Sequence, residues 1–348
     1  MTPFVILYIY LIVAFFASKQ IKNPQKRSKR FCVFSFLGLL FLLGFHSPTI
    51  GTDVDGFYVP YFERCLSDPI SFSFVGGIEP LFHDFTYLIK SLTDDVQVYL
   101  FIVAIIILFP IIFLFYKQSN NIFLSLIFYV SFTLFHFAFS GLRQAMAISI
   151  VCLGFYYLLK NNWKLFVLLV LLASTFHTSA IFAIIALPLM KIDLSDYVWL
   201  IIFIVFAFII AAMPSVILVI VDLIFSEGKY QSALDEKNGS ITLAFLYLLF
   251  ALFQIFLAKK NHQKSMVQFT LLLFVVQLTG LRSNFAARIG YYFLPLMFIF
   301  IPNVIESTKG KGLKNLLVTA FTAFLVFFFV YSNGGGYLEV IPFKFCWE

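Results

Sequence analysis

The stretch Ser140-Gly141-Leu142-Arg143-Gln144-Ala145 interrupts a part of the chain that is otherwise almost purely apolar, from Ile122 to Phe139 before it and from Ala147 to Leu159 after it. Each apolar flank approaches the roughly 20 residues that a helix needs to cross a bilayer. An arginine between two such helices is costly unless it faces water, a partner or an anionic ligand. We therefore expect a helical hairpin with Arg143 at its mouth.

The composition defines the class of protein. Of the 348 residues, 61% are hydrophobic and 12% are charged, whereas soluble domains carry about 25% charged residues. This composition predicts an all-α polytopic integral membrane protein and excludes a soluble enzyme with a single anchor. The net charge of +7 does not indicate a nucleic-acid partner, because the lysines lie in short loops between apolar runs, as in the cytoplasmic loops of membrane proteins.

The order of apolar and basic segments predicts a topology with about 10–12 transmembrane or re-entrant helices. The basic run at residues 19–30 follows the first apolar segment rather than preceding it, which places the N-terminus on the outer, periplasmic side. The order of crossings that follows leaves the tail from Ser332 on the outer side as well. The expected apolar segments are 4–17, 31–45, 96–116, 122–139, 147–159, 165–190, 199–221, 241–258, 266–281, 289–304 and 316–331.

One of these segments, 165–190, has two interpretations. If it is a single span, the basic loops at 259–264 and 309–314 fall on the outer side, against the positive-inside rule. If it consists of two short segments that turn near His177, both loops return to the cytoplasmic side. Segment 199–221 is the alternative place for an irregular crossing. The chain as a whole, residues 1–348, is expected to form one transmembrane domain with a larger periplasmic loop at 46–95 and a smaller one at 222–240.

The hairpin topology brings four basic side chains to the outer face, namely Arg143, His177, Arg282 and Arg288. Arginine has a planar fork of donors that suits phosphate groups, so these residues, with Gln144 beside Arg143, are candidate ligands for a phosphate-bearing substrate. The alternative for each arginine is that it only reaches the membrane interface from a helix end. His177 could equally be a satisfied polar residue at a turn, or it could bind phosphate or transfer a proton.

Acidic residues of the 46–95 loop are the candidate catalytic groups. Asp53-Val-Asp55 has the D-x-D form found in sugar transferases, and a carboxylate there could act as general base on a sugar hydroxyl. Glu79, directly before Pro80, is a second candidate carboxylate and is assigned to the residues that contact the pyrophosphate or sugar, although an acidic residue at that place could simply favour a helix N-terminus. The following aromatic residues are candidates for stacking on sugars or for an interfacial belt; they are Phe57, Tyr58, Tyr61 and Phe62. The histidines show no metal-ligand spacing, so no metal or other cofactor is predicted.

Taken together and in order, five motifs resemble the EpsG family of Wzy-type bacterial surface polysaccharide polymerases. They are Gly-Thr-Asp at 51–53, Glu-Pro at 79–80, Ser-Gly-Leu-Arg-Gln-Ala-Met-Ala at 140–147, Phe-His-Thr-Ser-Ala at 176–180, and Arg288 followed by Tyr-Tyr-Phe at 291–293. The Arg-Gln and His-Thr-Ser motifs are the most specific. The Asp53–Tyr58 segment departs a little from the family pattern, so the choice between Asp53 and Asp55 stays open.

The resemblance implies a glycosyltransferase of the bacterial inner membrane that joins undecaprenyl-pyrophosphate-linked oligosaccharide repeat units at the periplasmic face. It also implies a flippase and a chain-length regulator of the same pathway as partners. In such an enzyme Arg143 and Arg288 would bind the pyrophosphate, His177 would bind phosphate or transfer a proton, and Asp53 would activate the acceptor hydroxyl. The alternatives are a ligase resembling O-antigen ligase and a transporter or flippase of the lipid-linked unit.

Overall fold

The computed structural model describes residues 2–212, 240–261, 265–281, 284–333 and 337–348. These residues form helices and connecting turns, and the described ranges contain isolated β-bridges but no strand. The chain divides into two compact units, one formed by Met1–Ile181 with Val318–Glu348 and the other by Phe182–Leu317. The all-α prediction is confirmed.

The apolar segments become helices of two lengths. Among the described residues, five helices are long and apolar enough to cross a membrane: α1 (Thr2–Lys19), α5 (Val96–Gln118), α8 (Leu142–Leu159), α14 (Ile241–Asn261) and α18 (Lys311–Asn333). Six shorter apolar helical segments of 10–17 residues accompany them. The chain is therefore a polytopic membrane protein, as the composition predicts. Helix α2 (Pro24–Gly44) carries the basic run in its first turns and is apolar beyond it.

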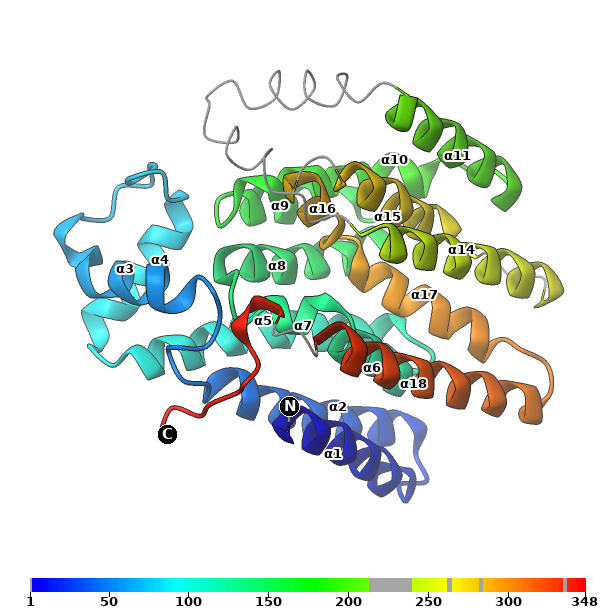
Figure 1. Ribbon diagram of the computed structural model, residues 1–348, viewed down its shortest axis with the longest axis horizontal. Coiled ribbons are helices and arrows are strands. Elements are labelled where there is room, and N and C mark those ends of the chain that lie inside the picture. Colours follow the sequence, from blue (N-terminus) through cyan, green and yellow to red (C-terminus); the bar gives the residue numbers. More distant parts are fainter. Residues whose placement is uncertain (1, 213–239, 262–264, 282–283, 334–336) are drawn as a thin grey trace. The chain divides into compact units, whose positions relative to one another are not determined.

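Within the first unit, the long helices pack as a series of neighbours. Helix α1 packs against α2, α2 against α5, and α5 against α8, which in turn packs against α9 (Trp163–Ser174). Figure 1 shows these helices running side by side. The C-terminal segment returns to this unit, because Phe329 of α18 lies against Phe4 of α1 with ring centroids 5.6 Å apart.

The expected apolar span at 122–139 is not one continuous helix. It consists of α6 (Ile122–Ser131) and α7 (Thr133–Phe137), separated at Phe132, whose backbone is extended. The Ser131 hydroxyl at this break bonds the Tyr8 hydroxyl of α1 at 2.8 Å. Helix α8 then begins at Leu142, which puts Arg143 in its first turn, at the mouth of the expected hairpin.

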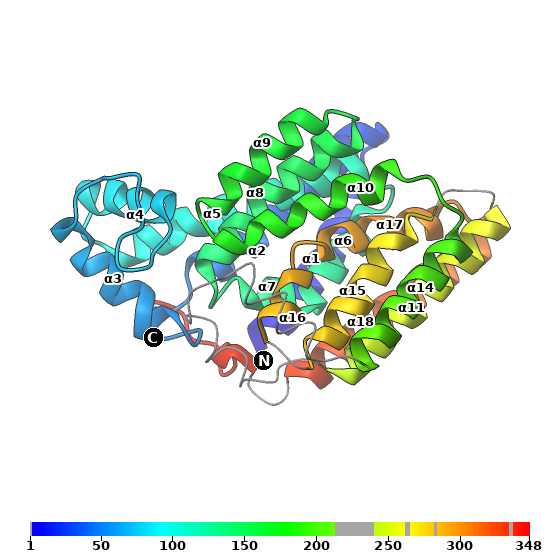
Figure 2. The ribbon, with the colours of Figure 1, turned by 90° about the horizontal axis from the view of Figure 1, so that it is seen from above.

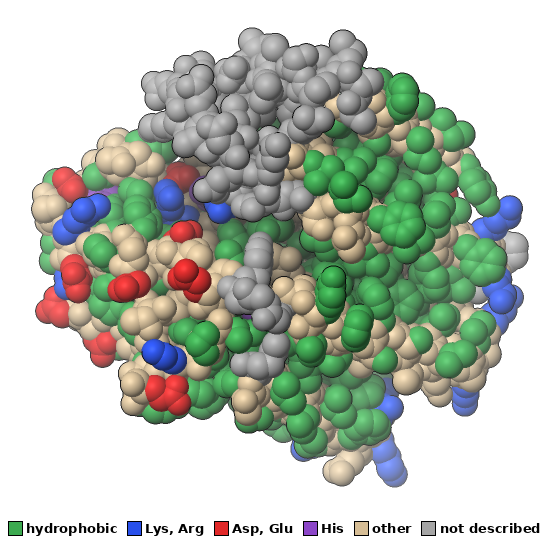
Figure 3. Space-filling view, in the orientation of Figure 1, with side chains coloured by type: hydrophobic (Ala, Val, Ile, Leu, Met, Phe, Trp, Pro, Cys, Tyr) green, Lys and Arg blue, Asp and Glu red, His purple; other side chains and the backbone are tan. Residues whose placement is uncertain are grey.

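The expected outer loop at 46–95 is largely structured. It contains a π-helical turn (Val54–Tyr58), α3 (Val59–Arg64), a 3-10 turn (Cys65–Ser67) and α4 (Pro80–Leu92). In both ribbon views these elements lie at one end of the unit's long helices (Figures 1 and 2). Acidic side chains gather over this end (Figure 3), including the exposed Asp55, Glu63, Asp68, Asp94 and Asp95.

Both chain ends lie at this same end of the first unit. The amide of Ser47 donates to the Lys344 carbonyl at 3.0 Å, and the amide of Cys346 donates to the Phe45 carbonyl at 3.0 Å. The Phe343 ring lies 5.6 Å from that of Phe4 near the start of α1. The start of α1 and the C-terminal tail therefore lie beside the 46–95 region.

The second unit has α15 (Val267–Thr279) at its centre, packed against α11 (Asp196–Ala212), α14, α16 (Asn284–Gly290) and α17 (Leu294–Glu306). Buried amides inside it are hydrogen-bonded, as the Thr270 hydroxyl donates to Gln254 Oε1 at 2.5 Å. The expected loop at 222–240 lies outside the described residues apart from Ser240.

The segment 165–190 is two short helical pieces rather than one span. Helix α9 ends at Ser174, and after a turn at residues 175–177 a 3-10 helix (Thr178–Ile185) leads into α10 (Ala186–Lys191). The break at His177 is the one that the positive-inside rule favours in the sequence.

Candidate functional site

The centre of the candidate site is the carboxylate of Glu79. Glu79 is the residue before α4 and is followed by Pro80, which suits the first helical position because it has no amide hydrogen to lose. The Glu79 side chain makes no capping bond to its own helix. Instead the Leu81 amide, in the first turn of α4, donates to the Thr175 carbonyl at 3.0 Å. Because the turn after α9 accepts this hydrogen bond, the Glu79 carboxylate can bond to other partners.

Those partners come from two distant segments of the chain. Glu79 Oε2 accepts from Arg143 Nη1 at 2.7 Å, and Oε1 accepts from His177 Nδ1 at 2.9 Å and from the Thr178 amide at 3.1 Å. The Glu79 side chain is 6% exposed, whereas those of Arg143 and His177 are each 23% exposed. The carboxylate thus lies beneath two basic groups that remain accessible from outside. We call these three side chains the Glu79 cluster.

The environment keeps Glu79 ionised. Burial alone would raise the pKa of Glu79, but the hydrogen bond and charge of His177, the charge of Arg143 and the Thr178 amide together lower it from 4.5 to about 2. Donors that stabilise a carboxylate lower its pKa in this way. Glu79 is therefore an anion at physiological pH and cannot itself accept a proton there.

Arg143 is further positioned by two aromatic residues of the π-helical turn. The Arg143 amide donates to the Tyr58 hydroxyl at 3.3 Å, and the guanidinium carbon lies 5.1 Å from the centre of the Phe57 ring. Tyr58 is buried, and this burial raises the pKa of its phenol. Arg143 Nε is buried and has no hydrogen-bond partner among the described residues. The guanidinium is thus held by one of its nitrogens and retains further donors for a ligand.

A second set of contacts ties the Gly51–Asp53 segment to the start of α8. The hydroxyls of Thr52 and Ser140 are 2.6 Å apart. Gly51 has φ +93°, and a Cβ atom there would lie 2.1 Å from the Phe139 carbonyl oxygen, so this approach requires glycine. These contacts fix Asp53 close to the loop that carries Arg143.

The two aspartates of the D-x-D form differ in environment. Asp53 is partly buried and its carbonyl accepts the amides of Phe57 and Tyr58, so it lies at the base of the π-helical turn. Asp55 lies within that turn and is exposed. The structure thus places Asp53 next to the aromatic residues that hold Arg143, and Asp55 on the outer surface.

The remaining basic and amide candidates are Gln144, Arg282 and Arg288. Gln144 follows Arg143 in α8 and is buried. Arg288 is exposed on α16, which belongs to the second unit. Arg282 lies outside the described residues. Within the described ranges no group of three His, Cys, Asp or Glu side chains is arranged to hold a metal ion.

Sequence reasoning underestimated Tyr58 and Thr178. Tyr58 was grouped with aromatics of an interfacial belt, yet it is 3% exposed and bonded to Arg143. Tyr58 lies three residues before Tyr61 and four before Phe62, a helical spacing that places the three rings on one buried face. The spacing was not recognised because the whole segment is rich in aromatic residues. Thr178 entered the sequence analysis only as part of the motif at 176–180, but both its amide and its hydroxyl lie within hydrogen-bond distance of Glu79 Oε1.

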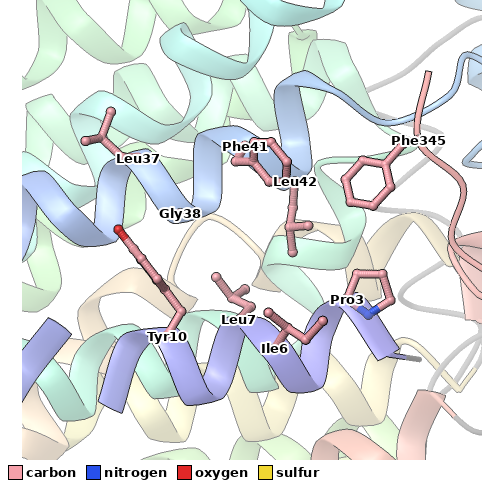
Figure 4. A pocket seen from close by; sticks show the side chains of 9 residues that line it. All are labelled: Pro3, Ile6, Leu7, Tyr10, Leu37, Gly38, Phe41, Leu42 and Phe345. Atoms are coloured by element: carbon pink, nitrogen blue, oxygen red, sulfur yellow. The ribbon is translucent and has the colours of Figure 1, made fainter. Parts of the chain in front are cut away.

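A separate hollow of about 330 Å³ lies between α1 and α2 (Figure 4). Pro3, Ile6, Leu7 and Tyr10 line it from α1, Leu37, Gly38, Phe41 and Leu42 from α2, and Phe345 from the tail. It contains no charged side chain and no member of the Glu79 cluster. This groove suits hydrocarbon rather than phosphate.

The fold and the site together define a class: a polytopic all-α membrane protein with a partly accessible arginine and histidine fixed on a buried glutamate beside a structured acidic loop. Comparison with known protein families identifies the family within this class. The pattern of the EpsG family matches residues 29–345, nearly the whole chain, and the chain belongs to this family.

The EpsG family is associated with Wzy-type polysaccharide polymerases. The chain is therefore a membrane protein of polysaccharide biosynthesis with a polymerase-type role. A search of curated proteins finds no match, and neither does a search of solved structures.

Proposed function

We propose that this protein is an inner-membrane glycosyltransferase that polymerises undecaprenyl-pyrophosphate-linked oligosaccharide repeat units at the periplasmic face. The observation that carries the proposal is the Glu79 cluster, in which a glutamate from the outer loop fixes Arg143 and His177 with both side chains partly accessible. Family membership supplies the reaction class, and the cluster supplies groups suited to it.

In the proposed reaction, a hydroxyl oxygen of the acceptor sugar attacks the anomeric carbon of the donor chain. The bond from that carbon to the phosphate oxygen breaks, the lipid pyrophosphate leaves with the bonding electrons, and the hydroxyl proton passes to a base. Negative charge therefore develops on the leaving pyrophosphate. Cations fixed in advance lower such a barrier, because little reorganisation is needed as the charge forms.

Arg143 is the group we assign to that charge. One of its nitrogens is committed to Glu79 at 2.7 Å, which orients the guanidinium, and its remaining donors are free to bind phosphate oxygens. Glu79 is a positioning residue in this account, because its carboxylate is buried and satisfied by its partners. Arg288 is proposed as a second pyrophosphate ligand and Gln144 and Arg282 as further substrate contacts, on sequence grounds alone.

His177 and Asp53 are the candidates for proton transfer. With Nδ1–H donated to Glu79, a neutral His177 ring carries a lone pair on Nε2 that can accept a proton, and a protonated ring can bind phosphate there. Asp53 is partly exposed and fixed near the start of α8 by the neighbouring Thr52–Ser140 bond. We assign acceptor activation to Asp53 and phosphate binding or proton relay to His177.

The test uses a strain that lacks this gene and analyses its surface polysaccharide on a gel. The strain is complemented with wild type, Arg143→Ala, Arg143→Lys or the control Arg64→Ala, at matched membrane levels. Arg64 is a suitable control because it is an exposed arginine of the same loop region. We expect a ladder with wild type and Arg64→Ala, and a single repeat unit with both Arg143 variants.

Other outcomes would change the assignment. A full ladder with both Arg143 variants would remove Arg143 from the pyrophosphate site. Absence of surface sugar in the deletion strain, with lipid-linked units retained on the cytoplasmic side, would indicate a flippase. Free polymer that is not attached to its final acceptor would indicate a ligase.

A further inference from the structure

The segment before α4 holds two phenylalanine rings out into solvent. Phe72 and Phe74 are 73% and 62% exposed, although they lie in the structured acidic region rather than on an apolar helix. Phe72 also has φ +50°, a left-handed backbone conformation that bulky residues rarely adopt. Such strain persists only where surrounding structure imposes it, and it is found preferentially at ligand-binding places. We call residues 69–77 the aromatic loop.

Both ends of the aromatic loop are anchored. At its start, His83 Nε2 lies 3.1 Å from the Asp68 carbonyl and donates to it. The other ring nitrogen, Nδ1, lies 2.6 Å from the Tyr61 hydroxyl. At its end, the amides of Val75 and Ile78 exchange hydrogen bonds at 3.2 and 2.9 Å. The exposed rings of Phe72 and Phe74 are therefore carried by a segment whose two ends are held by hydrogen bonds.

The C-terminal end of the aromatic loop is directly followed in the chain by the Glu79 cluster. Ile78, at the end of the anchored stem, is buried, and the next residue along the chain is Glu79 itself. A ligand that contacts the aromatic loop is thus connected through a short, hydrogen-bonded segment to the residue that positions Arg143 and His177.

The charges around the loop indicate what kind of ligand it suits. Residues 65–89 contain no lysine or arginine, and the exposed charges just before the loop are Glu63, Arg64 and Asp68, so acidic groups outnumber the single basic one. Segments that insert into anionic membrane surfaces usually combine aromatic residues with basic ones, so this charge pattern opposes a membrane anchor. Carboxylates, the hydroxyls of Ser71 and Ser73 and aromatic faces together suit sugars. Sugar hydroxyls can donate to the carboxylates and the serine oxygens, and the C–H faces of sugar rings can pack on the aromatic rings.

We propose that the aromatic loop is a saccharide-binding site, in which Phe72 and Phe74 stack on sugar rings of the polysaccharide and retain the growing chain beside the Glu79 cluster. This inference rests on the proposed polymerase function. It assigns the loop to chain retention rather than to bond formation, so its loss shortens the product without abolishing it.

The first test measures chain length. The deletion strain is complemented with wild type, the double variant Phe72→Ala/Phe74→Ala, or the control Phe208→Ala, whose ring on α11 is equally exposed at 73%. We expect the double variant to yield a ladder shifted to shorter chains and the control to match wild type. A double variant with the wild-type length distribution would overturn the saccharide-binding loop. Absence of a ladder from wild type itself would defeat the proposed function instead.

The second test separates sugar from membrane and does not depend on activity. The full chain carries Phe72→Trp, with Trp163, Trp199 and Trp347 replaced by phenylalanine, and is placed in nanodiscs of brominated phosphatidylcholine. We expect tryptophan emission that the bromine atoms do not quench and that shifts on addition of surface polysaccharide purified from the same strain. Adding Phe74→Ala should weaken that binding by about tenfold, the effect of losing one stacked ring. Quenching by the brominated lipid without a response to polysaccharide would identify a membrane anchor and refute the proposal.

Discussion

Glu79 and the Asp53–Asp55 pair belong to the same outer region, yet they occupy opposite environments. The Glu79 carboxylate is buried and satisfied by Arg143, His177 and Thr178, whereas Asp55 is exposed and Asp53 is only partly buried. A carboxylate whose oxygens are bonded to fixed donors organises a site but is a poor proton acceptor. The comparison thus assigns positioning to Glu79 and leaves proton transfer to groups that are more accessible.

The largest effect should come from removing Glu79. Glu79→Ala leaves the partly buried Arg143 and His177 without their shared partner, and we expect loss of polymer together with a free energy of unfolding lowered by about 2 kcal/mol. The measurement pairs the polysaccharide gel with thermal unfolding of the purified protein. The exposed Glu63 of α3 provides the control, since Glu63→Ala should change neither. Wild-type polymer from Glu79→Ala would contradict the positioning role.

The second effect separates the two aspartates. Asp53→Asn should reduce polymer formation about 100-fold, the usual contribution of a general base, while Asp55→Asn should behave like wild type because its side chain is exposed on the outer surface of the π-helical turn. Initial polymerisation rates in isolated membranes would measure both. If Asp53→Asn retains its rate and His177→Gln loses it, the proton acceptor is His177.

The third effect is a pH dependence of stability. Because its partners lower the pKa of Glu79 to about 2, its contribution to stability is fully present above pH 4.5 and is lost as the pH falls through about 2. Unfolding temperatures measured across this range should fall more steeply for wild type than for Glu79→Gln. Parallel curves for the two proteins would show that the ion pair with Arg143 is not formed in solution.

The smallest effect concerns the bond that fixes the Gly51–Asp53 segment. Thr52→Val removes the hydroxyl that lies 2.6 Å from Ser140 while keeping the shape of the side chain, and it should cost about 1 kcal/mol of stability with less than a tenfold loss in polymerisation rate. Ser140→Ala removes the other partner, and the double variant should be no worse than either single variant. Fully additive losses would indicate that the two hydroxyls do not act through each other.

Sequence reasoning reached the residues of this site but not their pairing. Arg143 was identified because an arginine between two apolar helices is costly unless it faces water, a partner or a ligand. His177 was identified because the positive-inside rule, applied to the later basic loops, favours a turn at this residue. Glu79 was treated as one of several substrate contacts, since nothing local indicates that a residue 64 positions before Arg143 and 98 before His177 bonds to both. Such a contact depends on how α4, α8 and α9 pack, which periodicity alone does not determine.

The fold was predicted more completely than its irregularities. Composition and loop charge led to an all-α membrane protein, and hydropathy located most helices, since a backbone in lipid has few alternatives to the helix. The break at Phe132 was missed because residues 122–139 are uniformly apolar, and the break coincides with a bond between Ser131 and Tyr8 of a distant helix. Apart from a possible helix start at Glu79–Pro80, the helical content of the 46–95 region was also missed, since its many polar residues favoured an outer loop.

The most direct test of the account reconstitutes the reaction with purified components. Lipid-linked repeat units extracted from the deletion strain are incubated with the purified chain in nanodiscs, and the products are sized by mass spectrometry. We predict that wild type and Arg64→Ala lengthen the chains and release lipid pyrophosphate, whereas Arg143→Ala and Glu79→Ala do neither. Polymer formed equally by Arg143→Ala, or none formed by wild type from authentic lipid-linked units, would contradict the claim that the Glu79 cluster is the centre of a polysaccharide polymerase.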